Sequence, residues 1–490
     1  MIIFRKKNDV YLEVVKATDR GEERMLADWF TFLVDGHQFM PAFRNKYWDG
    51  KIRLYDVNKK IIYCGLVKEI MKFSETMDVT IEFEGSKYDI PGIEQPLDDE
   101  FAEGFLKALK PMSRGKEIEM RDYQKEAFKT AIRRQRALLL SPTASGKSLI
   151  IYSLIRWYRE VHDRKILIVV PTVSLVSQMI SDFTDYSNGE FDDVQGIQGG
   201  TTKDITSRVV VSTWQSIYKM PKSWFAQFGS VIVDEVHTAQ AKSLKGIMEN
   251  LLICPDRIGL TGTLQDAQTS ELVLKGLFGP VKKMITTKEL MDRDQIAKMK
   301  IKMLQFDYNN DDRKLVSKMD YQKEIDFLVN NEQRNNIISR MAADLKGNTL
   351  VIFQRIEHGK KLYDAIETDK HKFYVAGETD KESREASRLF AEENDVIIVA
   401  SLGVFSTGVN IRNLHNLIFA HPTKSKIKVL QSIGRVLRKA DEKDEAIVYD
   451  IVDDLKHGQR QNFALRHANE RFKHYTNENF NYKLHTIKLK

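Results

Sequence analysis

The sequence predicts an α/β protein with two parallel sheets, and three observations support this fold class. Short apolar runs typical of buried strands alternate with longer segments typical of helices between about residues 118 and 454. Such alternation predicts parallel strands joined by right-handed crossovers. The alternation restarts near residue 280, which indicates two such domains. Several predicted strands also end in polar residues, at the sheet edge where open α/β folds bind ligands.

Length and composition limit the possible classes. A chain of 490 residues is too long for a single hydrophobic core, so we expect about three domains. Charged residues at 30% and hydrophobic residues at 42% are typical of a globular chain rather than a disordered one. No apolar run approaches the ~18 residues of a membrane span, so we expect no membrane partner. The two widely separated cysteines, Cys64 and Cys254, predict neither a disulfide framework nor a zinc site and fit a reducing cytoplasm.

The positive charge is concentrated near the C-terminus. Residues 456–490 hold eight Lys and Arg residues against two Glu residues, so they carry +6 of the net charge of +7. A basic segment of this kind predicts a polyanionic partner.

The most informative motif is a loop of small residues between a predicted strand at 137–140 and a predicted helix at 149–157. A strand, a loop ending in Gly-Lys-Ser and a helix predict a phosphate-binding loop whose N–H groups face the phosphates. Lys147 is then expected to reach the β/γ-phosphates and the Ser148 hydroxyl to bind Mg²⁺. The strict pattern is not met, because Ser141 and Ala144 stand where glycine is common. The candidate ATP-binding residues here are Ser141, Pro142, Thr143, Ala144, Ser145, Gly146, Lys147 and Ser148.

A second motif, Asp234-Glu-Val-His237, follows an apolar strand at 229–233. Two adjacent carboxylates at the end of a buried strand lose hydration, so they predict a functional role. We expect Asp234 to hold Mg²⁺ and Glu235 to orient and deprotonate the attacking water. The alternative is a solvated acidic turn.

Further polar residues follow other predicted strands or precede the phosphate loop. The amide of Gln124 offers a donor and an acceptor that suit an adenine edge, although a helix-surface glutamine is the alternative. Two segments at strand ends, Pro171-Thr172 and 212–216 with Ser212 and Thr213, offer hydroxyls and N–H groups that suit phosphodiester contacts. A further strand ends in hydroxyls at Thr261-Gly262-Thr263.

The second predicted α/β domain has no phosphate loop but contains a basic helical segment at 431–438. Gln431, Arg435 and Arg438 share one helix face, because they are spaced four and three residues apart. Facing the first domain, they would meet the γ-phosphate as arginine fingers. The alternative is an ordinary solvated basic face.

The N-terminal region predicts a small α/β domain with a nucleic-acid surface at 43–55. Aromatic rings can stack on bases while neighbouring cations meet phosphates. Alternatively, Trp48 and Tyr55 are core residues of a hairpin that turns at Asp49-Gly50. The candidate residues are Arg44, Lys46, Trp48, Lys51 and Arg53.

We therefore expect five segments along the chain. They are a small N-terminal α/β domain at 1–90, a linker at 91–112, two parallel-sheet domains at 113–285 and 286–455, and a basic helical C-terminal segment at 456–490.

The ordered motifs resemble superfamily-two helicases of the DExH type, and the whole chain is most similar to the branch-migration helicases of T-even bacteriophages. The matching segments are 121–124, 141–148, 171–172, 212–216, 234–237, 261–263, 406–410 and 431–438. The resemblance implies two RecA-like motor domains with ATP and Mg²⁺ in the cleft, with Arg121 and His237 added to the ATP site. It implies that His237, Thr261, Gly262 and Thr263 couple hydrolysis to movement. It also implies a nucleic-acid track along Pro171, Thr172, Ser212, Thr213, Thr407 and Gly408.

The resemblance further implies an ATP-dependent DNA helicase that serves recombination, repair and replication. Its expected reactions are branch migration, fork regression, D-loop and R-loop unwinding, and annealing. Its expected partners are branched DNA, single-stranded DNA and RNA–DNA hybrids, with single-strand-binding or recombination proteins, and we expect a monomer in the host-cell cytoplasm. An RNA helicase stays open as an alternative, because RNA duplexes are recognised by shape and leave no short sequence mark. A duplex translocase that does not unwind is a second alternative, which the absence of a nuclease or methyltransferase signature disfavours. A nucleotide switch without fast hydrolysis is disfavoured by Glu235 and the two arginine candidates.

Overall fold

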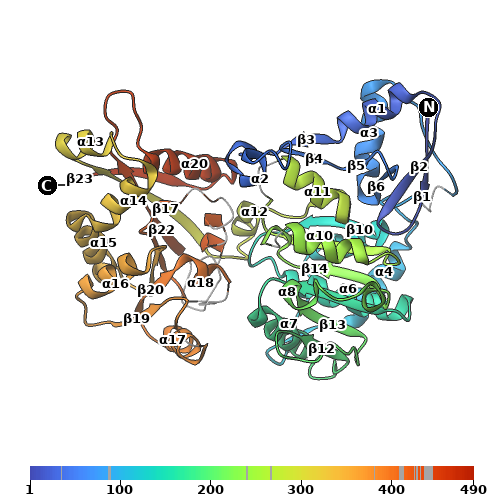
Figure 1. Cartoon of the computed structure of the whole chain (residues 1–490). Helices are drawn as coiled ribbons and strands as arrows, with labels where there is room; N and C mark the ends of the chain where they lie inside the picture. Colours follow the sequence, from blue (N-terminus) through green and yellow to red (C-terminus); the bar gives the residue numbers. More distant parts are fainter. Residues whose placement is uncertain are drawn as a thin grey trace. The chain divides into compact units, whose positions relative to one another are not determined.

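The computed structural model describes every residue except 35, 87–89, 239–240, 265–267, 380, 408–412, 424, 426–428, 431, 435–444 and 490. The chain forms two compact units (Figure 1). The first comprises residues 1–141 and 146–284, and the second comprises residues 142–145 and 285–490. Within the described residues, no helix is both long enough and apolar enough to cross a membrane.

The first unit begins with a five-stranded sheet in the order β5-β6-β2-β1-β7. Its strands are β1 (Ile2–Lys6), β2 (Tyr11–Ala17), β5 (Tyr55–Asp56), β6 (Ile61–Tyr63) and β7 (Ile81–Phe83). Helices α1 (Arg20–Trp29) and α3 (Val67–Met77) accompany this sheet and bury Leu26, Ile70 and Phe73. The small N-terminal α/β fold expected from the sequence is therefore present.

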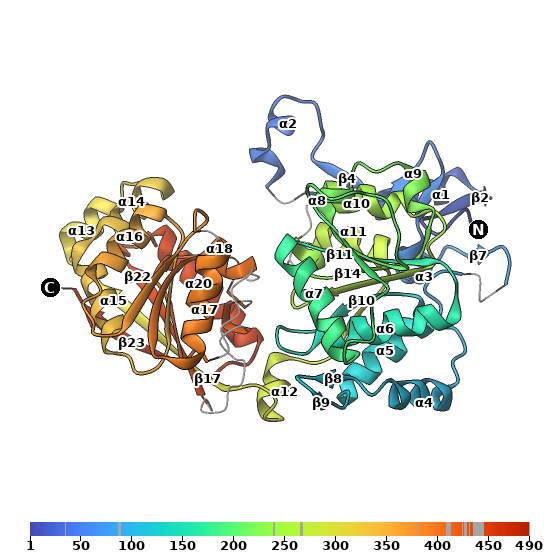
Figure 2. The ribbon, with the colours of Figure 1, turned by 90° about the horizontal axis from the view of Figure 1, so that it is seen from below.

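A segment of two strands and the long connection between them, residues 31–53, projects from this N-terminal region and is called the ribbon below. Strands β3 (Thr31–Leu33) and β4 (Lys51–Arg53) pair antiparallel, and their connection holds η1 (His37–Phe39) and α2 (Pro41–Arg44). Figure 2 shows the η1–α2 segment extending away from the rest of the first unit. The turn possibility at Asp49-Gly50 is wrong, because these residues end a long connection and lie directly before β4.

The first unit is centred on a seven-stranded sheet in the order β12-β13-β11-β14-β15-β10-β16, and every pairing in it is parallel. Strands β11 (Lys165–Val170) and β14 (Phe228–Val233) are almost entirely apolar and buried, as expected for strands covered on both faces. The other strands are β10 (Arg136–Leu140), β12 (Val194–Ile197), β13 (Val209–Thr213), β15 (Asp256–Thr261) and β16 (Val281–Lys283). The helices that follow the N-terminal domain are α4 (Asp99–Leu109), α5 (Asp122–Arg134), α6 (Lys147–Val161), α7 (Val173–Tyr186), α8 (Trp214–Ile217), α9 (Lys222–Phe225), α10 (Ala241–Asn250) and α11 (Gln268–Phe278), with η4 (Val236–Thr238) and the short ribbon of β8 (Met112–Ser113) and β9 (Lys116–Glu117).

Alternate residues of these strands contribute to two separate cores. In β11, Leu167 and Val169 belong to one cluster, whereas Ile166, Ile168 and Val170 belong to the other. The second cluster includes Ala102 and Leu106 of α4, a helix within the segment expected to be a linker. The period-two alternation of a strand thus fixes which helices each face of the sheet carries.

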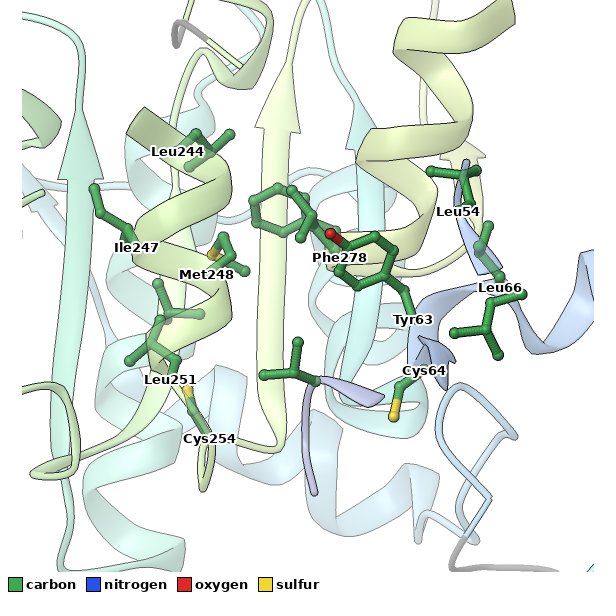
Figure 3. Close-up of a cluster of buried hydrophobic side chains, with 14 of the residues drawn as sticks. Leu54, Tyr63, Cys64, Leu66, Leu244, Ile247, Met248, Leu251, Cys254 and Phe278 are labelled. Atoms are coloured by element: carbon green, nitrogen blue, oxygen red, sulfur yellow. The ribbon is translucent and has the colours of Figure 1, made fainter. Parts of the chain in front are cut away.

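The other cluster joins the N-terminal domain to the first seven-stranded sheet (Figure 3). Tyr63, Cys64 and Leu66 of β6 and η2 (Cys64–Leu66) belong to the same core as Met248 of α10 and Phe278 of α11. The hydroxyls of Tyr11 and Tyr63 both donate to Glu249 Oε1, at 2.8 and 2.7 Å. The Tyr63 ring packs directly on the backbone of α11 at Gly276, where an added Cβ would lie only 2.9 Å from the ring. The N-terminal domain and the first parallel sheet are therefore one body.

The second unit holds another seven-stranded, wholly parallel sheet, in the order β19-β20-β18-β21-β22-β17-β23. Its strands are β17 (Lys298–Asp307), β18 (Thr349–Phe353), β19 (His371–Val375), β20 (Val396–Ser401), β21 (Asn416–Phe419), β22 (Glu445–Asp454) and β23 (Tyr482–Lys488). Its helices include α12 (Thr287–Asp292), α13 (Asn310–Val316), α14 (Tyr321–Asn330), α15 (Glu332–Asp344), α16 (Ile356–Ala365), α17 (Lys381–Glu393), α18 (Leu402–Thr407) and α20 (Phe463–Asn477).

The basic C-terminal segment is built into this second sheet. It contains the expected helix, α20, but also strand β23, which pairs with β17 at the sheet edge. Arg471 of α20 is buried and bonds to Asp450 of β22, with Nη2 and Oδ1 2.6 Å apart. One of the eight basic residues therefore neutralises a buried carboxylate and is not offered to a partner.

Candidate active site

The phosphate-loop candidate connects β10 to α6, as expected. The Ser141 N–H donates to the Thr261 carbonyl at 2.9 Å, which ties the start of the loop to the neighbouring strand β15. Gly146 has a φ of 77°, and a Cβ there would collide with the Gln124 side chain, so glycine is required. Ala144 also has a positive φ, 67°, which explains why glycine is common at this position.

Two motifs 87 residues apart meet at the carboxyl edge of this sheet. Lys147, the first residue of α6, lies with Nζ 3.1 Å from Glu235 Oε1 at the end of β14. Lys147 Nζ also donates to the Ser141 carbonyl at 3.4 Å. Glu235 adopts a φ of 50°, a left-handed conformation that is uncommon outside glycine and clusters at functional sites. The loop lysine and the acidic motif therefore form one site.

Asp234 and Glu235 experience different surroundings. Asp234 is only 7% exposed, and its Oδ1 accepts the Glu235 N–H at 2.9 Å. Burial, together with the neighbouring Glu235 carboxylate, raises the pKa of Asp234 to about 7, while Lys147 opposes this shift. Burial and the neighbouring carboxylate both disfavour the charged form of Asp234, and a cation bound beside it would offset them.

His237 lies beside the acidic pair and reaches the end of β15. Burial, with Lys147 nearby, lowers the pKa of His237 although Glu235 opposes the shift, so the ring is neutral at pH 7. Its Nδ1 contacts Thr261 Oγ1 and lies 3.3 Å from Glu235 Oε2, a hydrogen-bonding rather than an ionic arrangement. Thr261 Oγ1 in turn donates to the Thr263 carbonyl at 2.9 Å. The coupling candidates therefore form a continuous chain from Glu235 to the segment after β15.

The donor set fits Mg²⁺. Ser148 and Asp234 offer hydroxyl and carboxylate oxygens, the type of ligand that Mg²⁺ prefers. Among the described residues, no group of three or more His, Cys, Asp or Glu side chains could hold a metal ion alone. A Mg²⁺ ion here would therefore depend on nucleotide phosphates and water for its other ligands, which is how this ion is usually held.

Gln124 is buried beneath the loop. Its Oε1 accepts the Arg121 N–H at 2.8 Å as part of the capping box of α5, and its Nε2 points to the Gly146 carbonyl at 3.5 Å. Arg121 donates from Nη1 to the Tyr123 hydroxyl at 2.9 Å. Part of the Gln124 amide is thus used to hold the helix and the loop in place.

The strand-end hydroxyls divide into two kinds. Thr172 is partly exposed and caps the N-terminus of α7 by accepting the Leu175 N–H at 3.4 Å. Ser212 and Thr213 are buried; Ser212 donates to the Ile197 carbonyl at 2.9 Å, and Thr213 Oγ1 lies 2.9 Å from Ser216 Oγ. The side chains of Ser212 and Thr213 therefore hold the end of β13, and Pro171 and Thr172 are the more accessible candidates for a nucleic-acid contact.

Four candidates from the second predicted α/β domain lie outside the described residues. These are Gly408, Gln431, Arg435 and Arg438. Thr407 is the last residue of α18, directly after β20.

The N-terminal candidates lie on the ribbon, and the structure separates their roles. Arg44, Lys46 and Lys51 are exposed, whereas Arg53 pairs with Asp49. The Trp48 indole N–H donates to the Lys51 carbonyl at 2.8 Å, so this ring belongs to the ribbon's own framework.

The aromatic residues most open to solvent on the ribbon are ones that the sequence pattern did not single out. Tyr47 is 86% exposed and Phe39 is 71% exposed, whereas Tyr55 is buried and donates to Glu23. Nothing in the alternation of aromatic and basic residues distinguishes exposed Tyr47 from its half-buried neighbour Trp48. Only the fold of the η1–α2 connection decides which ring faces water.

Three family models match successive parts of the chain. Residues 4–84 match the family described as DNA helicase UvsW, N-terminal. Residues 117–266 match the res subunit of type III restriction enzymes, and residues 332–440 match the helicase conserved C-terminal domain.

Individual relatives extend over nearly the whole chain. The ATP-dependent DNA helicase uvsW of Enterobacteria phage T4 is 38% identical over 483 residues, which covers 95% of each chain. The crystal structure of T4 UvsW matches with 36% identity and a TM-score of 0.54, and covers 100% of both chains. The DNA 3'-5' translocase XPB2 of Sulfurisphaera tokodaii is 26% identical over 68% of this chain and 82% of its own. With two RecA-like parallel sheets and this similarity along its full length, the chain belongs to the uvsW family of superfamily-two helicases.

Proposed function

We propose that this protein uses ATP hydrolysis to remodel branched DNA by branch migration, fork regression, unwinding of D-loops and R-loops, and annealing. The observation that carries the proposal is the meeting of Lys147 with Glu235, beside buried Asp234, in a chain of the uvsW family. The relative from phage T4 is by name an ATP-dependent DNA helicase. DNA, including single strands and RNA–DNA hybrids, is the proposed substrate.

The geometry of the site supports the following division of roles in hydrolysis. Lys147 is proposed to bind the β/γ-phosphates, Gln124 to contact the adenine, and Arg121 to belong to the same ATP-binding site. Ser148 and Asp234 hold Mg²⁺, which neutralises phosphate charge when bound. Glu235 positions and deprotonates the attacking water. Phosphates that attract Lys147 would also draw it from Glu235, which leaves that carboxylate available as the base.

The remaining site residues supply transition-state charge and coupling. Arg435 and Arg438, with Gln431 on the same predicted helix face, are proposed as arginine fingers from the second domain. His237, Thr261, Gly262 and Thr263 are proposed to transmit hydrolysis, along the hydrogen bonds from His237 through Thr261 to Thr263. The residues proposed to contact the DNA backbone are Pro171, Thr172, Thr407 and Gly408. The side chains of Ser212 and Thr213 hold the end of β13.

The N-terminal ribbon is the proposed source of preference for branched DNA. Its exposed cations suit phosphates, and its exposed rings at Phe39 and Tyr47 suit unpaired bases. We further propose that the protein acts as a monomer in the host-cell cytoplasm, in recombination, repair and replication, beside single-strand-binding or recombination proteins.

The proposal is tested by ATPase rates measured side by side with single-stranded DNA, linear duplex, a four-way junction and RNA. The four-way junction is expected to stimulate most, and Lys147→Ala is expected to abolish hydrolysis with every nucleic acid while the protein stays folded. Stimulation by RNA alone would support an RNA helicase. Equal stimulation by linear duplex and junction, without strand separation, would support a duplex translocase.

A further inference from the structure

The hydroxyl group of Tyr186 lies against the serine that is proposed to bind Mg²⁺. Ser148 Oγ and the Tyr186 hydroxyl oxygen are 2.8 Å apart, a hydrogen bond in which either group can donate. The two residues are 38 positions apart in the sequence, and Tyr186 belongs to none of the helicase motifs. Both lie in the first unit, so the contact does not depend on the placement of the second.

The Tyr186 ring packs against α6, and the end of α7 that carries it is anchored as well. The ring packs on Tyr152, with ring centroids 5.5 Å apart, and Tyr152 lies one helical turn after Ser148 on α6. At the end of α7, the neighbouring Asp185 carboxylate accepts the Arg114 N–H at 2.9 Å. The ring is partly buried. The phenol hydroxyl is thus held at a defined position beside Ser148.

A serine that ligates a cation needs a partner for its own hydrogen. The oxygen lone pair must point at the metal, and the O–H must then point elsewhere and find an acceptor. A tyrosine hydroxyl can accept that hydrogen while donating its own. Outer hydrogen-bond partners of this kind orient metal ligands, and their loss typically lowers metal affinity by about 10–100-fold.

We propose that Tyr186 is a positioning residue that accepts the Ser148 hydroxyl hydrogen and thereby directs the Ser148 oxygen at the Mg²⁺ bound with the nucleotide. This inference rests on the proposed function, because it takes Ser148 as a metal ligand. The opposite polarity, in which Tyr186 donates to Ser148, would compete with the metal for the serine lone pair.

The test is the affinity for ADP, measured by calorimetry with Mg²⁺ and again with EDTA. Tyr186→Phe keeps the ring and removes only the hydroxyl, so it is expected to weaken Mg²⁺–ADP binding about tenfold and to leave metal-free ADP binding unchanged. Tyr152→Phe is the matched control. It removes a hydroxyl from the same aromatic cluster, but that hydroxyl accepts from Arg156 at 2.7 Å and is not the hydrogen-bond partner of Ser148. Tyr152→Phe is expected to match the wild type in both conditions.

A double-mutant cycle separates positioning from packing. Ser148→Ala should lose the Mg²⁺-dependent part of the affinity, and adding Tyr186→Phe should cost nothing more. Additive losses of affinity in the double mutant would overturn the inference. So would a Tyr186→Phe variant that loses ADP affinity equally with and without Mg²⁺, gains Mg²⁺–ADP affinity, or binds as the wild type does. If wild-type ADP binding does not respond to Mg²⁺ at all, the metal assignment of the proposed function fails as well, which is a distinct result.

Discussion

At the scale of single residues, Asp234 and Glu235 are neighbours in sequence that the fold prepares for different tasks. Asp234 is buried with a pKa of about 7, whereas Glu235 faces Lys147 at 3.1 Å. Pairs of carboxylates whose surroundings differ in this way commonly divide acid–base and charge-holding roles. The backbone at Glu235 is left-handed, a conformation that this residue adopts without being glycine.

The raised pKa of Asp234 predicts a pH-dependent affinity for Mg²⁺–ADP. Below about pH 7 this carboxyl group is protonated, so Mg²⁺ must displace a proton, and affinity should fall by up to about tenfold per pH unit. The stability of the nucleotide-free protein should change with pH in the opposite direction. Because folding raises the pKa of this carboxyl group, its protonation stabilises the folded protein at acidic pH, and this stabilisation is lost as the pH rises to about 7. Calorimetry in two buffers of different ionisation enthalpy should detect the released proton at about pH 6. An affinity that stays constant from slightly acidic to slightly alkaline pH would contradict the assignment.

Glu235→Gln should separate nucleotide binding from hydrolysis. The amide keeps the shape of the side chain but cannot take a proton, so turnover should fall by on the order of 10² or more. ATP binding should persist, because Lys147 then has no anionic partner to leave. ATPase rates and nucleotide titrations on the same preparation check this. A parallel loss of binding and turnover would indicate that Glu235 serves the fold instead.

At the scale of elements, the strands were predictable and the contacts between elements were not. Apolar runs such as 165–170 and 229–233 became β11 and β14, because parallel strands buried on both faces need continuous apolar sequence. Helix α7 shows what the pattern omits: it begins after Thr172, a candidate DNA contact, and ends at Tyr186, which touches Ser148. Spacing along one chain cannot indicate that a residue 38 positions away completes a site.

The ribbon at residues 31–53 should bias the protein towards branched DNA. Replacing Arg44, Lys46 and Lys51 with Ala should weaken binding to a four-way junction more than to single strands, and the ATPase rate without DNA should not change. Arg53 is left in place, because its charge is paired with Asp49. The matched control removes three exposed charges elsewhere on the same domain, at Lys16, Arg20 and Lys72.

Binding of both substrates is measured at two salt concentrations. For every duplex phosphate that the ribbon variant no longer neutralises, the slope of log affinity against log salt should become shallower by about 0.9. If the ribbon and control variants behave alike, the effect is one of overall charge. If neither changes junction binding, the ribbon has no part in substrate choice.

At the scale of the whole molecule, the two RecA-like sheets were predictable, but the attachment of the N-terminal domain was not. Residues such as Leu66 and Met248 look like ordinary core residues in the sequence, and only the fold shows that they share one cluster. The C-terminal segment was predicted from its charge, yet Arg471 pairs with Asp450 of the second sheet and β23 is an edge strand of that sheet. Neutralising exposed lysines of this segment is therefore a better test of DNA affinity than deleting it.

Glu249 should couple the stability of the N-terminal domain to that of the motor sheet. Glu249→Ala leaves the hydroxyls of Tyr11 and Tyr63 without their shared acceptor, which should cost about 1–3 kcal/mol of unfolding free energy. Thermal unfolding should remain a single transition for the first unit, since one cluster spans both parts. A triple variant removes the whole network with Tyr11→Phe, Tyr63→Phe and Glu249→Leu. It should lose less unfolding free energy than Glu249→Ala, because no tyrosine hydroxyl is left without its partner. Two separate transitions in wild-type protein would show that the N-terminal domain folds independently.

Whether ATP hydrolysis drives the remodelling of branched DNA is tested by the conversion of a labelled four-way junction by wild-type protein and by Glu235→Gln, with and without ATP. We expect ATP-dependent conversion by the wild type and none by the variant, although both bind the junction equally well, because the ribbon is intact in each. Conversion that proceeds equally with Glu235→Gln, or without ATP, would contradict this expectation.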